Sequence, residues 1–323
     1  MMRKRKKIRP VSAKSERYKV KNWSAYNQSL KKRGSLRFWL PDDIESKWYY
    51  QGKKRRGGQP RFSDFCIEVC CIIRKIYRLP YRQTEGLLQS ILVMSGIDLK
   101  VPDASVICRR SKRLKIKLGG KIRKHSIDLV MDSTGLKVYG EGEWKVRIHG
   151  RCKHRTWRKI HLAADPRTGL IQAGQMTTNS ISDGQMVKPL LKQLRTKVEK
   201  LAADGAYDQH KVYDELKRLK IYPLIPPKKN ARILKHKNSR GRTVPRDRNL
   251  RLIRSLGRKE WKKQSGYHKR SLVENIMYRY KTILGDKLQA RDPLRQNVEA
   301  MICCKILNKM NLAGMPISYK IAN

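Results

Sequence analysis

The chain has 323 residues, with 77 Lys or Arg against 26 Asp or Glu, which gives a formal net charge of +51. The length suits two domains, and so much positive charge is tolerable only when a polyanion neutralises it, so the composition indicates a nucleic-acid partner. It argues against a membrane protein, because no apolar run approaches the roughly 20 residues of a membrane span and no signal-peptide core follows the basic start; we expect a soluble, cytoplasmic chain.

The first 20 residues are basic and poor in apolar side chains. This composition is typical of a flexible arm, which either stays solvated or touches a DNA backbone. Three tryptophans follow among Lys and Arg residues, where they either stack on bases or anchor a poorly packed segment to the core, which is the interpretation we favour. They are Trp23, Trp39 and Trp48.

The seven cysteines contain no CxxC pair, and most lie in apolar helical contexts. We interpret them as reduced core residues rather than a disulfide frame or a zinc knuckle. Cys152, His154 and His161 resemble a metal-ligand set, but they lack a credible fourth member.

Apolar spacing predicts three helices, over residues 62–77, 82–94 and 104–115, with Asp103 capping the third. The third helix carries several cations, among them Arg109, Arg110 and Arg113. A short, capped and cationic third helix favours a helix-turn-helix-like DNA-binding domain over residues 21–122. The alternative is a helical bundle with a solvated basic face.

The periodicity then changes to alternating strands. We expect a strand over residues 126–131 that ends at Asp132, a hairpin over 157–164 and 170–176, and a helix from Ser182 to about residue 197. A buried strand over 200–203 ends at Asp204, and a helix at 209–219 and a strand at 221–225 follow.

This order predicts an α/β fold, in which a ribonuclease-H-like mixed-sheet core over residues 123–323 follows the all-α domain. Residues 228–263 are very basic with little apolar pattern. They form either a disordered loop or a small insertion that touches DNA.

Residues 267–281 predict a helix with two chemically different faces. Within an arc of roughly 60° lie a phenol, cations and one acid, while apolar residues gather on the far side. The four polar residues are Tyr267, Arg270, Glu274 and Lys281. One alternative is a surface helix on which Arg270 and Glu274 form an i,i+4 ion pair.

Three acids from distant parts of the chain could therefore converge: Asp132, Asp204 and Glu274. Phosphoryl transfer on DNA uses two divalent ions about 3.5–4 Å apart, and magnesium or manganese takes carboxylate oxygens. An Asp at a strand end is also a common turn residue, so each acid alone carries little weight.

Three motifs around these acids resemble those of bacterial insertion-sequence transposases of the DDE type, specifically the insertion-sequence-five family and its relatives. The first two are Met131-Asp132-Ser133-Thr134-Gly135 and Ala203-Asp204-Gly205-Ala206-Tyr207-Asp208. The third spaces Tyr267, Arg270, Glu274 and Lys281 as in the Tyr-Arg-Glu-Lys signature of that superfamily. The resemblance extends from about Tyr18 to about Asn311.

The resemblance implies that Asp132, Asp204 and Glu274 hold the metal ions, with magnesium preferred and manganese tolerated, and that Tyr267, Arg270 and Lys281 hold backbone phosphates. It implies hydrolysis at the ends of the element, followed by attack of the freed 3′-hydroxyl on target DNA. The expected partner is double-stranded DNA, both transposon ends and target, bound by a homodimer in the bacterial nucleoid.

Two alternatives remain beside this interpretation. One is a host nuclease with the same core. The other is a catalytically silent or domesticated DNA-binding protein of the same family. An RNA-binding protein is the weakest candidate, because aromatic readout motifs of single-stranded RNA modules are absent.

Overall fold

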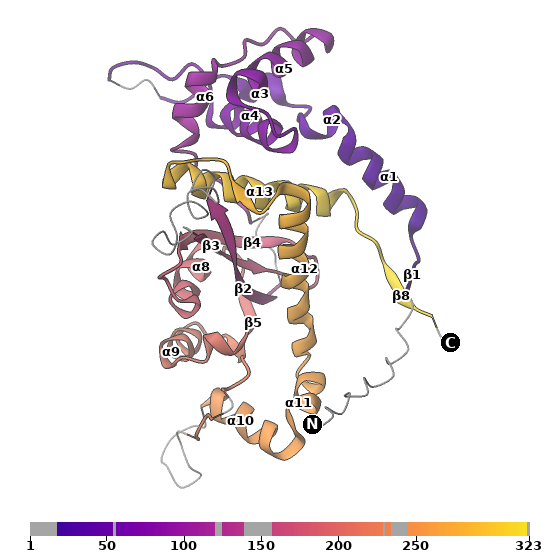
Figure 1. Cartoon of the computed structure of the whole chain (residues 1–323), viewed down its shortest axis with the longest axis vertical. Helices are drawn as coiled ribbons and strands as arrows, with labels where there is room; N and C mark the ends of the chain where they lie inside the picture. Colours follow the sequence, from indigo (N-terminus) through magenta and orange to yellow (C-terminus); the bar gives the residue numbers. More distant parts are fainter. Residues whose placement is uncertain are drawn as a thin grey trace, which may run out of the picture.

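The computed structural model describes residues 18–53, 56–119, 125–138, 157–228, 230–233 and 244–321. A group of helices from the first third of the chain lies above a mixed sheet that is flanked by further helices (Figure 1). The expected N-terminal arm up to residue 17, and the expectations about Cys152 and His154, lie outside the described residues. Among those residues, no helix is both long and apolar enough to cross a membrane.

The first third of the chain forms short helices, which are α1 (Trp23–Gly34), α2 (Leu36–Trp39), α3 (Ile44–Trp48), α4 (Asp64–Ile76), α5 (Tyr81–Met94) and α6 (Ala104–Ser111). Helices α4, α5 and α6 pack against one another, as the apolar spacing predicts. Asp103 caps α6 as expected by accepting from the Ser105 N–H at 2.6 Å, but α6 ends at Ser111 rather than at residue 115. Trp39 and Trp48 are buried anchors, whereas Trp23 is exposed.

The sheet consists of β2 (Ile127–Val138), β3 (Trp157–Ala164), β4 (Ile171–Thr178), β5 (Val198–Ala202), β6 (Tyr222–Leu224) and β7 (Lys287–Leu288). Its order is β4-β3-β2-β5-β6, with β7 beside the far end of β2. Strands β4, β3 and β2 are antiparallel neighbours, and β5 and β6 continue the sheet in parallel. A mixed α/β fold of this kind is consistent with a ribonuclease-H-like core.

Strand β2 is longer than the sequence predicts. We expected it to end at Asp132, but it continues to Val138 because it pairs with β3 from Val130↔Ala164 to Lys137↔Trp157. Asp132 therefore lies in the middle of a strand and not at its end. The turn propensity of the residues after Asp132 is overridden by these ladder hydrogen bonds.

The two faces of the sheet pack against different helices. Val130 of β2 shares a hydrophobic cluster with α12 (Ser271–Arg279) and α13 (Pro293–Ala313). Its neighbours Leu129 and Met131 share another cluster with α8 (Val187–Gln193) and α9 (His210–Arg218). Successive strand residues point to opposite faces, so every second residue of β2 faces α12. The helix expected from Ser182 to about residue 197 is instead the 3-10 turn η1 (Asp183–Met186) followed by α8, which ends at Gln193.

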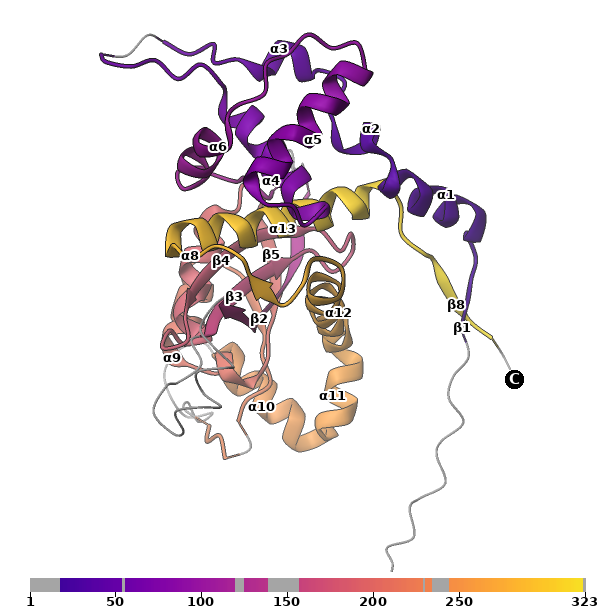
Figure 2. The same ribbon diagram turned by 45° about the horizontal axis from the view of Figure 1, so that its top comes forward.

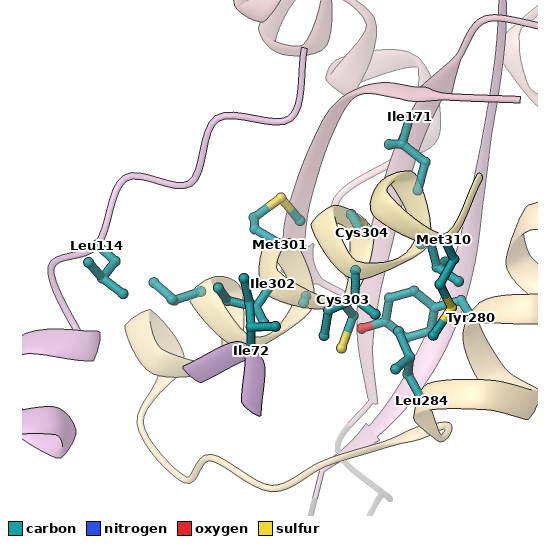
Figure 3. Packing of buried hydrophobic residues seen from close by; sticks show 14 of the residues in the cluster. Ile72, Leu114, Ile171, Tyr280, Leu284, Met301, Ile302, Cys303, Cys304 and Met310 are labelled. Atoms are coloured by element: carbon teal, nitrogen blue, oxygen red, sulfur yellow. The ribbon is translucent and has the colours of Figure 1, made fainter. Parts of the chain in front are cut away.

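Helix α13 connects the N-terminal helices to the sheet (Figure 1). Figure 3 shows its buried side chains between Ile72 of α4, Ile171 of β4 and Tyr280 next to α12. A buried ion pair of 2.7 Å between Lys75 and Glu299 also ties α4 to α13. The six cysteines among the described residues are free thiols. Cys66, Cys70, Cys303 and Cys304 are buried in this core as predicted, whereas Cys71 and Cys108 are half-buried.

Helices α10 (Pro245–Leu256) and α11 (Arg258–Gln264) lead from the region after β6 back to α12 (Figure 1). The disordered-loop interpretation of residues 228–263 is therefore wrong for residues 245–263. Away from the sheet, β1 (Tyr18–Val20) and β8 (Ser318–Lys320) form a two-stranded antiparallel pair beside α1 (Figure 2). The sequence gives little signal for this pairing, because the two strands are short and lie at opposite ends of the described chain.

Candidate active site

Two acidic residues meet on the neighbouring parallel strands β2 and β5. The register pairs Val130 with Ala202. Two residues further along each chain, Asp132 and Asp204 therefore come next to each other with their side chains on the same face. That face is the one covered by α12 and α13.

The two aspartates differ in their surroundings. Asp204 follows the end of β5 as predicted and caps the short turn η2 (Gly205–Tyr207), whose Ala206 N–H donates to its Oδ1 at 2.9 Å. The side chain of Asp132 is 17% exposed. Burial raises the pKa of Asp132, and the negative charge of Asp204 adds to this. The site therefore favours a cation close to these two carboxylates.

Arg270 supplies a cation at this position. It closes the 3-10 turn η3 (Tyr267–Arg270) before α12 and donates from Nη1 to Asp132 Oδ2 at 2.9 Å. Its Nη2 forms the i,i+4 ion pair with Glu274 that the helical wheel allows. Burial opposes the charged form of Arg270, but the surrounding phenol and carboxylates prevail and raise its pKa. Arg270 thus joins an acid of the sheet to an acid of α12.

The three predicted acids have the donor chemistry for a divalent metal ion, because Mg²⁺ and Mn²⁺ take carboxylate oxygens. Across the described ranges, however, no three His, Cys, Asp or Glu side chains are close enough together to hold a metal ion. The Arg270 guanidinium lies between Asp132 and Glu274 and neutralises both. Asp132, Asp204 and Glu274 therefore match a divalent ion by donor type, but within the described residues their carboxylates are not gathered around one point.

The remaining residues of the signature are placed differently. Tyr267 is buried, with 7% exposed, next to the Arg270 guanidinium, which lies 5.9 Å from the centre of its ring. Its hydroxyl donates to the Ala203 carbonyl at 3.2 Å, and burial raises its pKa to about 12. Its ring lies 5.6 Å from that of the buried Trp261. Lys281 is half-buried on η4 (Tyr280–Leu284), the π-helical turn after α12, and makes no ion pair with the described residues.

The cations of the third predicted helix divide into two kinds. Arg110 of α6 donates to the carbonyl of Phe62 and to Asp64 Oδ1, so it helps to hold α6 against α4. Arg109 and Arg113 are exposed. The structure thus leaves Arg109 and Arg113 accessible to a DNA backbone and gives Arg110 a structural partner.

Two further acids with distinct roles were missed in the sequence. Asp183 accepts from the Ser133 hydroxyl and from Lys159, and Asp208 forms a buried ion pair with Arg246. Asp183 directly follows Ser182, whose capping box with Gln185 reads as an ordinary helix start. Asp208 lies in the second acidic motif, but its partner comes from α10, in a segment with little apolar pattern.

Two sequence models of the transposase DDE domain match this chain, one over residues 31–141 and the other over residues 124–309. A solved structure with a similar arrangement is the cryo-EM structure of the piggyBac transposase synaptic complex with hairpin DNA. It is 13% identical, the match covers 88% of this chain and 75% of that one, and the TM-score is 0.40. Since the second domain model spans more than half of the chain, the chain belongs to the DDE transposase family and is a DNA transposase enzyme.

Proposed function

We propose that this transposase binds the terminal inverted repeats of its own insertion sequence, cuts the DNA at these ends and joins them to target DNA. Asp132, Asp204 and Glu274 are its catalytic acids. The observation that carries the proposal is the placement of Arg270, which brings Glu274 of α12 to Asp132 of β2, the strand neighbouring the Asp204 loop. One cation thus contacts two of the three acids, and the third, Asp204, follows the neighbouring strand β5.

The DDE transposase family depends in general on divalent metal ions. Two magnesium ions, or manganese, would activate the attacking oxygen and stabilise the leaving oxygen. Asp132 and Asp204 would hold them, because the two acids are neighbours and their mutual repulsion favours a bound cation. Glu274 would complete the ligand set, with the carboxylate that forms an ion pair with Arg270 in this structure.

A DNA phosphate can open that ion pair. A guanidinium binds phosphate in the same two-pronged geometry as it binds carboxylate, so the backbone of a transposon end competes for Arg270. If Arg270 paired with a DNA phosphate instead, the carboxylates of Asp132 and Glu274 would lose their counter-charge and would be free to bind metal ions. Lys281 holds a second phosphate, and Tyr267 supports the backbone of this turn.

The helices of residues 21–122 are the proposed DNA-binding domain, with Arg109 and Arg113 on the backbone and Arg110 bracing α6. Residues 123–323 are the catalytic domain, into which the basic stretch at about 228–263 is inserted. Because both ends of an element are cut in one event, the active form is a homodimer bound to paired ends.

The test is incubation of the purified protein with a linear duplex that carries the terminal inverted repeats, with and without Mg²⁺. We expect nicking at the ends that depends on Mg²⁺ and is lost in Asp132→Ala, Asp204→Ala and Glu274→Ala while DNA binding persists. Asp214→Ala, which removes an exposed carboxylate of α9, is the matched control and should cut normally. Binding without cleavage by the unaltered protein would favour a catalytically silent DNA-binding copy.

A further inference from the structure

A polar cluster lies on the opposite face of β2 from Asp132. Ser133, the next residue of the strand, points toward η1, where its hydroxyl donates to Asp183 Oδ1 at 2.8 Å. Lys159 of β3 donates to the same oxygen at 2.7 Å. The side chain of Asp183 is 18% exposed, so these two charge-assisted bonds form in a largely enclosed place.

Lys159 is the charge partner of Asp183. Burial alone would raise the pKa of Asp183, but the hydrogen bonds from Lys159 and Ser133 outweigh burial and lower the pKa of this carboxyl. The nearby His161 is fully buried, and burial lowers its pKa to about 4, so it is neutral near pH 7. Its Nδ1 lies 3.6 Å from Asp183 Oδ1 and has no hydrogen-bond partner among the described residues.

Starting the helix does not require the side chain of Asp183. Ser182 and Gln185 form the capping box of η1, so the turn has its cap without Asp183. The carboxylate of Asp183 instead reaches across to the sheet. A residue that only began η1 would not need contacts to β2 and β3.

The cluster is connected directly to Asp132. The backbone N–H of Ser133 donates to Asp132 Oδ1 at 2.8 Å, while its hydroxyl is held by Asp183. The same small residue therefore bonds to both acids, one on each face of the sheet. A shift of the Ser133 backbone would therefore move the N–H that bonds to Asp132.

Tyr207 is a second sign that this region serves the acids. It is 1% exposed, and its hydroxyl has no hydrogen-bond partner within the described residues. Burial raises the pKa of Tyr207, and the negative charges of Asp183, Asp132 and Asp204 add to the effect. A buried hydroxyl without a partner destabilises the fold, so packing alone does not explain a hydroxyl at this position.

We propose that Asp183 is a positioning residue of the catalytic centre: through the Ser133 hydroxyl it fixes the backbone that orients Asp132 toward the metal. This inference rests on the proposed function of Asp132. Loss of Asp183 frees Ser133 and leaves the charge of Lys159 without its partner beside the site. Both effects weaken metal binding at Asp132 while the DNA contacts remain intact.

The experiment is a double-mutant cycle of Asp183→Ala and Ser133→Ala, read by Mn²⁺ binding in electron paramagnetic resonance with the full chain bound to end DNA. Each single change should weaken Mn²⁺ binding about tenfold, the low end of the effect of residues that orient metal ligands. The double variant should bind no more weakly than Asp183→Ala alone, because the Ser133 hydroxyl acts through Asp183. Ser133→Thr keeps the hydroxyl and should restore most of the affinity.

Asp286→Ala is the matched control, since it removes the partner of Lys137 at 3.1 Å near the far end of β2. It should leave Mn²⁺ affinity unchanged. Additive losses in the cycle, or a fall in melting temperature of Asp183→Ala without a fall in Mn²⁺ affinity, would overturn the positioning role. If Asp132→Ala also left Mn²⁺ binding unchanged, the proposed function would fail and this inference with it; if only Asp183→Ala left it unchanged, this inference alone would fail.

Discussion

Asp204 and Asp208 belong to the same short loop after β5, yet their surroundings are opposite. The side chain of Asp208 is 1% exposed and both of its oxygens are bonded, one to the Tyr213 hydroxyl and Arg246 and the other to the Lys228 N–H. Asp204 is half-buried and caps its own turn. One acid has its hydrogen-bonding capacity filled by the protein, and the other keeps capacity for a cation.

This difference separates an acid that stabilises the fold from one available for chemistry. A buried carboxylate is tolerated when charge and hydrogen bonds satisfy it, as Arg246 does for Asp208. At the candidate site a single arginine, Arg270, is shared between Asp132 and Glu274, and Asp204 adds a further negative charge. The surplus of negative charge there is compatible with an additional cation.

The largest expected effect is on stability at Asp208. Asp208→Ala leaves Arg246, whose side chain is 12% exposed, without its main counter-charge, so we expect a loss of about 3–5 kcal/mol in the free energy of unfolding. Asp204→Ala removes only a capping hydrogen bond and should lose about 1 kcal/mol. Urea unfolding followed by circular dichroism measures both. Equal losses would contradict the division of roles between the two acids.

The pH dependence of the free energy of unfolding gives an independent test of the role of Asp208. Burial alone would raise the pKa of Asp208, but the bonds from Arg246 and the Lys228 N–H prevail and lower it. A lowered folded-state pKa contributes stability that is present above the unfolded value, about 3.9, and is lost as the pH falls through the folded-state value. Asp208→Asn should therefore lose less stability than the unaltered protein when the pH is lowered from about 5 to 2.

The sequence predicts the elements that carry strong local patterns. The β3–β4 hairpin, the strand before Asp204 and the cap of α6 by Asp103 follow from alternation and capping, and all three are present. The end of β2 is not predictable in this way, because Asp132-Ser133-Thr134-Gly135 has turn propensity and only pairing with β3 extends the strand.

The arrangement of the candidate site shows the same limit. The helical wheel assumed 100° per residue from Tyr267 onward, but residues 267–270 form a 3-10 turn, which has a larger rotation per residue and places Tyr267 in the core. Helix α10 has no strong apolar signal, because several of its buried residues are polar, such as Asp247 and Asn249. Contacts with distant parts of the chain decide both features.

An intermediate effect is expected at Arg270. Arg270→Ala leaves Asp132 and Glu274 without their shared cation, so the metal-free protein should lose about 1–3 kcal/mol of stability. Mg²⁺ should then raise the melting temperature of this variant more than that of the unaltered protein, because binding no longer competes with the guanidinium. Mg²⁺ at about 100 times its dissociation constant raises the free energy of unfolding by about 2.7 kcal/mol. Thermal unfolding with and without Mg²⁺, in the absence of DNA, measures the difference.

Arg218→Ala is the control for Arg270, since it opens an ion pair of 2.6 Å with Glu215 at the end of α9, on the other face of the sheet. Its response to Mg²⁺ should equal that of the unaltered protein. An equal Mg²⁺ response in Arg270→Ala would show that the arginine does not compete with the metal.

The smallest expected effect is at Lys281, which makes no ion pair with the described residues and is therefore free to hold a phosphate. Lys281→Ala should leave stability within about 0.5 kcal/mol of the unaltered protein. Loss of one phosphate contact should reduce the slope of log affinity against log salt concentration by about 1, equally for end DNA and unrelated DNA. Fluorescence anisotropy over a salt series measures the slope. Lys192→Ala on α8, behind the sheet, should leave the slope unchanged. An identical change in both variants would mean that charge alone, and not the position of Lys281 after α12, governs DNA binding.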